Sequence, residues 1–164
     1  MTDAKECINA SELEWEQTTH GERFENRRKR LSLATGGQLL GCSLFRVAPG
    51  RTAFPAHVHH ANEEALYILA GTGTLRLGDR ELPLQPGDYV TLPAGGPAHQ
   101  LIKSSQGDRE YLCLSTMISP EVVEYPDSEK VGVIVSGEGS VDPKERKLFK
   151  FYPQAKDVNI YEGE

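Results

Sequence analysis

The chain contains no apolar run that approaches the roughly 20 residues that a membrane-spanning helix needs. Residues 1–6 lack the apolar segment of a secretory signal peptide. The three cysteines, Cys7, Cys42 and Cys113, are odd in number, far apart and without CxxC spacing, so they do not indicate a disulfide framework. We therefore expect a cytoplasmic protein with reduced thiols and no membrane partner.

Methionine and tryptophan are also scarce, with two and one residues, whereas the chain has 16 glycines and 10 prolines. This balance favours a turn-rich β architecture over a helical bundle. The 164 residues suffice for one domain with a buried core. The formal net charge of −6 argues against nucleic acid as a partner. We interpret the one basic run, residues 27–30, as a solvated face or as ion-pair partners of acidic neighbours such as Glu22 and Glu25.

The pattern of the sequence divides the chain into three segments. Residues 1–36 form a polar, charge-rich extension in which at most a short helix is expected, since Ser11 and Glu14 have capping-box spacing. Residues 37–117 contain short apolar runs separated by turn signals. Residues 118–164 form a tail with apolar content of its own, which we expect to pack on the middle segment or on a partner subunit.

The middle segment predicts eight short strands. Such regular strands, punctuated by glycine and proline, indicate an all-β sandwich or barrel of antiparallel strands. The pair Gly78-Asp79 marks the loop of one hairpin. The expected strands cover residues 38–47, 52–59, 64–70, 73–77, 81–84, 88–92, 99–103 and 110–117.

The segment 57–64, with the sequence HVHHANEE, and a lone His99 carry the chemistry of the chain. Residues i and i+2 of a strand point to the same face, so His57 and His59 can reach one point in space. A glutamate a few residues on, across a turn, can join them from the neighbouring strand. Imidazole nitrogens and carboxylate oxygens are ligands that divalent first-row metals accept. The sequence therefore predicts one open metal site.

Strand alternation extends this prediction to the next strand. If His57 and His59 face inward, Glu64 begins the following strand inward too. Leu66 and Ile68 would then share the face of Glu64, and the residue between them would point to the other side.

Lys103 is the candidate for binding a substrate. In one register, His99, Leu101 and Lys103 share a strand face, which places Lys103 in the same cavity as the metal site. The opposite register would bury Gln100 and Ile102 instead. Lys103 then either contacts an anionic group of the substrate or forms an ordinary ion pair, because an unpaired ammonium is costly to bury.

These residues resemble the two sequence motifs of the cupin superfamily. The first motif, G(X)5HXH(X)3,4E(X)6G, is matched by Gly50, His57, His59, Glu64 and Gly71, with one extra residue after Gly50. The second motif, G(X)5PXG(X)2H(X)3N, is matched by Gly87, Pro93, Gly95 and His99, with one extra residue before His99. The spacing to Gly71 favours Glu64 over Glu63, and Lys103 stands where the family has asparagine.

The resemblance covers about residues 45–117 and implies a double-stranded β-helix, or jelly roll, with N- and C-terminal extensions. It implies one divalent metal ion of the Fe, Mn, Zn or Ni class in the mouth of the barrel, held by His57, His59, Glu64 and His99. The chain as a whole is similar to small single-domain cupins, some of which carry a sugar-phosphate isomerase label.

Two classes of function follow from these expectations. The first is a mononuclear metal enzyme that acts on a small anionic molecule, as an isomerase working through an enediolate or as a dioxygenase with redox-active iron. The second is a non-catalytic cupin that binds or senses a small ligand through the same metal. We also expect a homodimer, because a single small barrel leaves open sheet edges and an apolar tail that need cover.

Overall fold

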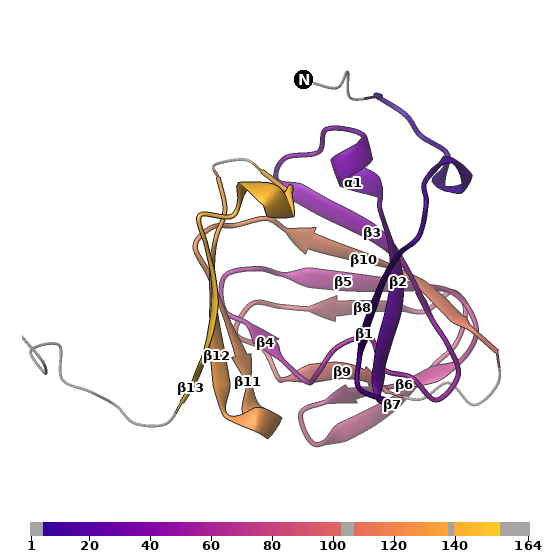
Figure 1. Ribbon diagram of the computed structural model, residues 1–164. Coiled ribbons are helices and arrows are strands. Elements are labelled where there is room, and N and C mark those ends of the chain that lie inside the picture. Colours follow the sequence, from indigo (N-terminus) through magenta and orange to yellow (C-terminus); the bar gives the residue numbers. More distant parts are fainter. Residues whose placement is uncertain (1–4, 103–106, 138–139, 155–164) are drawn as a thin grey trace, which may run out of the picture.

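The computed structural model describes residues 5–102, 107–137 and 140–154, and strands make up most of it (Figure 1). All strand pairs are antiparallel. The largest sheet has the order β1-β2-β3-β10-β5-β8, with β1 at Glu16–His20, β2 at Phe24–Arg30, β3 at Leu40–Val47, β10 at Arg109–Thr116, β5 at Glu64–Ala70 and β8 at Tyr89–Leu92.

Two smaller sheets complete the fold. One has the order β13-β12-β11-β4, with β13 at Leu148–Pro153, β12 at Lys130–Val135, β11 at Glu121–Tyr125 and β4 at Val58–His59. The other has the order β7-β6-β9, with β7 at Arg80–Leu84, β6 at Gly73–Leu77 and β9 at His99–Ile102. The helical segments are α1 at Leu31–Ala34 and 3-10 turns at Ala10–Glu12, Pro126–Ser128 and Pro143–Glu145.

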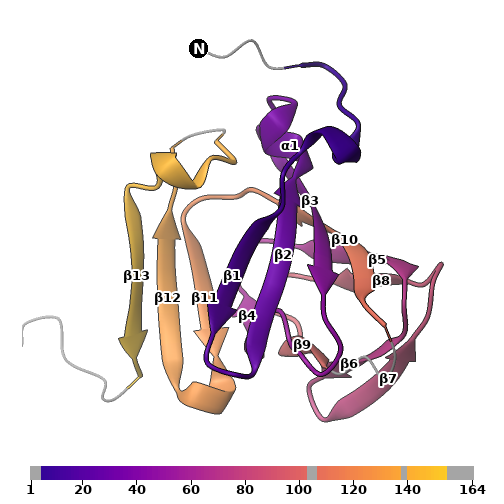
Figure 2. The same cartoon turned by 45° about the vertical axis from the view of Figure 1, so that its right-hand side comes forward.

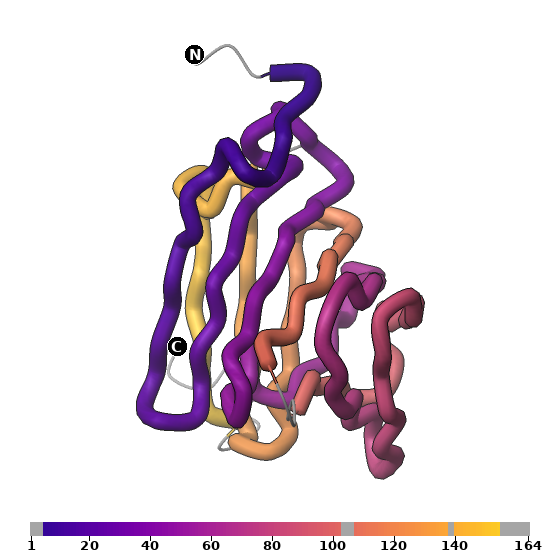
Figure 3. The backbone as a smooth tube through the Cα atoms, turned by 90° about the vertical axis from the view of Figure 1, so that its right-hand side faces the viewer, coloured from indigo at the N-terminus to yellow at the C-terminus, as the bar shows by residue number. Residues whose placement is uncertain are grey.

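The sheets curve around one interior and form an all-β jelly-roll barrel, as the sequence predicted. The N-terminal strands β1 and β2 and the C-terminal strands β11 to β13 stand on opposite sides of this interior (Figures 2 and 3). The core is apolar and aromatic, and it includes Phe45, Val47, Leu66, Leu75 and Tyr111. The rings of Phe45 and Tyr111 stack with centroids 5.3 Å apart, which ties β3 to its neighbour β10.

Most strands of the middle segment lie where the apolar runs placed them, and the predicted hairpin is present. β6 and β7 pair with Leu77 opposite Arg80, around the Gly78-Asp79 loop. The prediction of a continuous strand over 52–59 is wrong, because only Val58–His59 forms a strand. Pro55 interrupts the run, since proline has no N–H to donate to a ladder.

The described part of residues 1–36 contains only short helical segments, as expected, but it also contributes β1 and β2 to the large sheet, which the sequence did not predict. The capping box that does form uses Asn9 and Glu12 rather than Ser11 and Glu14. β2 reads FENRRKR, so its two faces are both polar and the apolar alternation that marks a strand is missing.

The tail packs on the barrel beside the histidine pair. β11 pairs with β4, with Val123 opposite His59 and Glu124 opposite Val58. The N-terminal strands β1 and β2 and the tail strands β11 to β13 each share a sheet with strands of the middle segment. The division of the chain at 36/37 and 117/118 therefore stays a prediction. Among the helices of the described residues, none has the length and apolar character needed to cross a membrane.

Candidate metal centre

The backbone holds His57 and His99 side by side. The N–H of His57 donates to the carbonyl of His99 at 3.1 Å, and the N–H of His99 donates to the carbonyl of His57 at 3.0 Å. This isolated bridge keeps His57 extended although it lies before the start of β4. The two imidazole centroids are 4.4 Å apart as a result.

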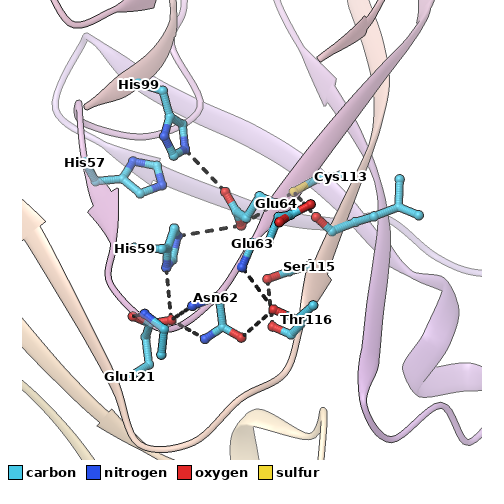
Figure 4. Close-up of polar contacts among 12 residues, drawn as sticks. His57, His59, Asn62, Glu63, Glu64, His99, Cys113, Ser115, Thr116 and Glu121 are labelled. Carbon is cyan, nitrogen blue, oxygen red and sulfur yellow. Dashed lines mark hydrogen bonds and ion pairs between the residues drawn. The ribbon is translucent and has the colours of Figure 1, made fainter. Parts of the chain in front are cut away.

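Glu64, the first residue of β5, faces these rings across the barrel (Figure 4). Its Oε2 atom lies 3.3 Å from Nε2 of His99, and its Oε1 atom lies 3.6 Å from Nε2 of His59. His57, Glu64 and His99 each offer one ligand atom, and these atoms all lie within 4.8 Å of one another. Three of the four residues that the sequence selected thus form one cluster, and His59 lies beside it, with its Nε2 atom facing Glu64.

A hydrogen bond behind His57 and a carboxylate behind His59 orient the two rings. Nδ1 of His57 lies 2.8 Å from the carbonyl oxygen of Pro55. A carbonyl can only accept, so Nδ1 carries the proton and Nε2 keeps its lone pair for the cluster. Nδ1 of His59 lies 3.5 Å from Oε2 of Glu121, which leaves Nε2 directed at Glu64.

Glu121 is a buried carboxylate, only 4% exposed, that supports His59 from behind. It accepts hydrogen bonds from the backbone N–H groups of His60, Ala61 and Asn62 at 3.0, 3.1 and 2.9 Å, and from the side-chain amide of Asn62. Burial raises the pKa of Glu121, but the hydrogen bonds from His59, Ala61 and Asn62 together outweigh it and lower the pKa to about 2. The carboxylate is therefore ionised at neutral pH.

The charge states of His57 and Glu64 suit a divalent cation, whereas burial lowers the pKa of His59 but Glu121 and Glu64 together raise it above its usual value. Burial, and next the nearby His99, lower the pKa of His57 to about 4, so this imidazole is neutral at pH 7. Burial raises the pKa of Glu64, but His99, His59 and His57 together lower it below its usual value, so Glu64 is ionised. Neutral imidazole and carboxylate are the forms that bind metals. The group of His57, Glu64 and His99 therefore fits one divalent ion with two nitrogen ligands and one oxygen ligand.

The cluster opens into a cavity of about 460 Å³ between the large sheet and the four-stranded sheet. Near the cluster the wall is aromatic, because the Tyr125 ring stacks on His57 at 6.0 Å and Phe54 lies 6.3 Å from the same imidazole. The opposite part of the lining includes Arg28 and Arg30 of β2. The basic run is therefore not simply a solvated face.

Cys113 of β10 lies beside the cluster, with its Sγ atom 3.8 Å from Oε1 of Glu64. Burial, and next the charge of Glu64, raise the pKa of Cys113 well above its usual value. The thiol is therefore protonated, whereas metal ligation and nucleophilic attack both require the thiolate. Cys113 packs against the cluster without adding a ligand.

Two neighbours of these ligands, Glu63 and His60, fall outside the cluster. Glu63 is exposed, and its backbone N–H donates to the hydroxyl of Thr116. His60 points to the other side of the strand, where Nε2 lies 3.5 Å from Glu124. Lys103, the predicted contact for a substrate anion, lies outside the described residues.

Sequence reasoning missed Glu121, although β11 carries a signal for it. Glu121, Val123 and Tyr125 occupy alternate positions of one strand and so share a face. Val123 is only 1% exposed, which shows that this face is buried. A charged residue on a buried strand face needs a partner, and here the partners are His59 and the backbone of residues 60–62.

Comparison with known proteins agrees with this geometry. Residues 43–115 match the family model of the cupin domain. The chain is 35% identical over 81 residues to quercetin 2,3-dioxygenase of Bacillus subtilis strain 168. That match covers 47% of this chain and 24% of the dioxygenase, so the chain corresponds to about a quarter of the curated relative's length.

Two crystal structures match nearly the whole chain. A candidate sugar phosphate isomerase from Acidithiobacillus ferrooxidans superposes with a TM-score of 0.79 and 26% identity, covering 96% of this chain and 98% of that chain. A sugar phosphate isomerase of the cupin superfamily from Silicibacter pomeroyi superposes with a TM-score of 0.76 and 22% identity, covering 94% and 97%. At 22% identity, the similarity to the Silicibacter protein shows a shared fold and nothing more.

Proposed function

Since residues 43–115 are a cupin domain and the chain belongs to the cupin superfamily, we propose that this protein is a mononuclear metal enzyme that acts on a small anionic molecule, as an isomerase of sugar phosphates. The proposed ligands are His57, His59, Glu64 and His99. The observation that supports the proposal is the convergence of His57, Glu64 and His99 at the wall of a cavity, with Nε2 of His59 3.6 Å from Oε1 of Glu64.

The residues around the cluster would bind and shield a small substrate. When bound, a divalent ion would act there as a Lewis acid on the oxygens of the substrate. Tyr125 and Phe54 flank His57 and would keep water away from that end of the cavity. The buried, ionised Glu121 would hold the His59 ring in one orientation.

The isomerase proposal draws on one of the two crystal structures that match the chain over almost its full length. The Acidithiobacillus protein is described as a candidate sugar phosphate isomerase, and its similarity covers both the barrel and the two extensions. Aldose–ketose isomerisation requires a site that binds two neighbouring oxygens of the substrate, and an open metal site provides this.

A dioxygenase is the second candidate, and one specific observation favours it. The identity with quercetin 2,3-dioxygenase is 35% over 81 residues, which is higher than the 26% and 22% identities with the two crystal structures. Dioxygenation requires a redox-active metal such as iron in the site. A cupin that only binds its ligand remains the non-catalytic alternative.

Metal analysis followed by two assays tests the proposal. The purified protein is incubated without oxygen with a panel of aldose phosphates, and formation of the ketose phosphate is followed. Oxygen uptake is measured separately with quercetin. We expect ketose phosphate formation that is lost in the His57→Ala/His59→Ala variant. Oxygen uptake with quercetin would instead establish the dioxygenase. If metal-loaded protein shows neither of the two activities, that result would contradict an enzymatic role.

A further inference from the structure

The cavity that holds the metal cluster is lined by arginines on its other side. Alternate residues of β2 point inward, so Asn26, Arg28 and Arg30 line the cavity. Arg27 lies between them, is exposed and points away. A fourth arginine, Arg146, lines the cavity from the segment just before β13. Three guanidinium groups therefore border one cavity.

Two of these guanidinium groups have no carboxylate partner. Nε of Arg30 lies 2.9 Å from Oε2 of Glu16, so its charge is paired. The Arg28 guanidinium lies over the ring of Phe45 at 5.6 Å, and the Arg146 guanidinium lies over that of Phe149 at 4.4 Å. Within residues 5–102, 107–137 and 140–154, neither has an acidic oxygen within ion-pair distance.

The carboxylates that line the same cavity are engaged elsewhere. Glu64 and Glu121 contact the imidazoles of the cluster, and Glu16 forms an ion pair with Arg30. Asp142 accepts the backbone N–H of Lys144 at 2.9 Å and caps a 3-10 turn. Among the described residues, Arg28 and Arg146 thus form no ion pair, and an anion that binds them would not displace a protein carboxylate from either guanidinium.

Aromatic rings connect the arginine side to the metal side. Phe45, which lies under Arg28, is 5.5 Å from Phe54, and Phe54 is 6.3 Å from the imidazole of His57. Arg28 and His57 therefore belong to one continuous wall. A molecule lying along these rings would have one end at Arg28 and the other at the histidines.

We propose that Arg28, with Arg146, is the subsite for the phosphate group of a phosphate monoester, whose other end reaches the metal centre. The part of this proposal in which the substrate reaches the metal rests on the proposed function. The phosphate subsite itself is inferred from the arginines alone. A phosphate monoester carries close to two negative charges at neutral pH, which matches the two unpaired guanidinium groups. The fork of N–H donors on arginine also suits phosphate oxygens. The phosphate would therefore be anchored on β2, a strand outside the two sequence motifs.

Calorimetric titration with inorganic phosphate tests this subsite. The proteins compared are the unmodified chain, Arg28→Met, Arg146→Met and the His57→Ala/His59→Ala variant. Methionine keeps an apolar stem over Phe45 but removes the guanidinium, with its charge and its N–H donors. We expect phosphate to bind the unmodified protein and to bind Arg28→Met about tenfold more weakly or worse, as for the loss of one charge-assisted hydrogen bond. Arg146→Met should weaken binding in the same direction.

Arg27→Met is the matched control, because it removes the same charge from the other face of the same strand. Its phosphate affinity should stay within about twofold of the unmodified protein, because Arg27 does not line the cavity. Arg28→Lys keeps the charge without the fork and should fall between Arg28→Met and the unmodified protein. Equal affinity in Arg28→Met and the unmodified protein, an equal loss in Arg27→Met, or no phosphate binding at all would overturn the proposal.

The histidine double variant separates this proposal from the proposed function. Phosphate should still bind this variant, since the arginines are unchanged, while its metal content is lost. If the unmodified chain holds no metal but binds phosphate through Arg28, the metal enzyme is wrong and the anion subsite stands. If phosphate binding disappears with the histidines and not with Arg28, phosphate binds at the metal and the subsite is wrong.

Discussion

Nδ1 of His59 lies 3.5 Å from Oε2 of Glu121, a carboxylate fixed by the backbone N–H groups of residues 60–62. The two residues are far apart in sequence, yet β11 pairs directly with β4 and brings them together. Carboxylates that bind the second nitrogen of a metal-ligating histidine fix its ring and increase its basicity. The C-terminal strands therefore help to build the candidate metal centre.

We expect Glu121→Gln to weaken metal binding by about 10- to 100-fold, the usual cost of losing such a supporting carboxylate. The change keeps the shape of the side chain but removes the negative charge behind His59. Metal affinity is measured by competition with a chelator of known affinity. Glu124→Gln is the matched control, because Glu124 is on the same strand but pairs with His60 near the surface. Equal affinities in the two variants would show that Glu121 does not support the site.

Glu64 and Glu63 are adjacent, and substitution separates their roles. Glu64 contacts His59 and His99 inside the barrel, whereas Glu63 is exposed. We expect Glu64→Gln to lose most of its metal, because an amide oxygen is a weaker ligand than a carboxylate. Glu63→Gln should retain the metal content of the unmodified protein by elemental analysis. The reverse result would assign the ligand to Glu63.

Asn62 fixes the crossover between β10 and β11. Its side-chain amide donates to the carbonyl of Ile118 at 3.0 Å, and its Oδ1 accepts the N–H of Ile118 at 2.7 Å and the hydroxyl of Thr116 at 3.2 Å. Asn62→Ala leaves these partly buried groups without their partner, so we expect the free energy of unfolding to fall by about 1–2 kcal/mol. Urea denaturation measures this loss, and Glu63→Ala should lie within about 0.5 kcal/mol of the unmodified protein.

We predict that the protein is a homodimer in solution. All five residues of β1 are exposed at one edge of the large sheet. At the edge of the other sheet, β13 exposes Phe149, Phe151 and Tyr152. Open edges with exposed aromatic residues are usually covered by another chain. Light scattering at micromolar concentration should give twice the mass of the chain, and a monomeric mass across the concentration range would rule the dimer out.

The barrel strands were predictable because their apolar residues alternate. In β5, Leu66 and Ile68 are buried and Tyr67 is exposed, as the period of two requires. The same rule brought His57 and His59 to one face, and motif spacing selected Glu64. Local sequence was sufficient here because each choice was between two faces of one strand.

The two extensions were less predictable because their strands carry mostly polar or isolated signals. β2 has charged residues on both faces, and only its pairing with β3 makes Arg28 an interior residue. Glu121 is buried through contacts with residues about 60 positions earlier, which no local pattern specifies. The interior position of Lys103 stays a prediction from strand alternation.

The most direct test of the account is the metal content of three purified proteins. The unmodified chain should contain about one divalent ion per chain by elemental analysis. His57→Ala/His59→Ala should contain essentially none, since it removes two of the four proposed ligands, whereas His60→Ala should match the unmodified chain because His60 points away. Full metal stoichiometry in the double variant would contradict the metal centre described here.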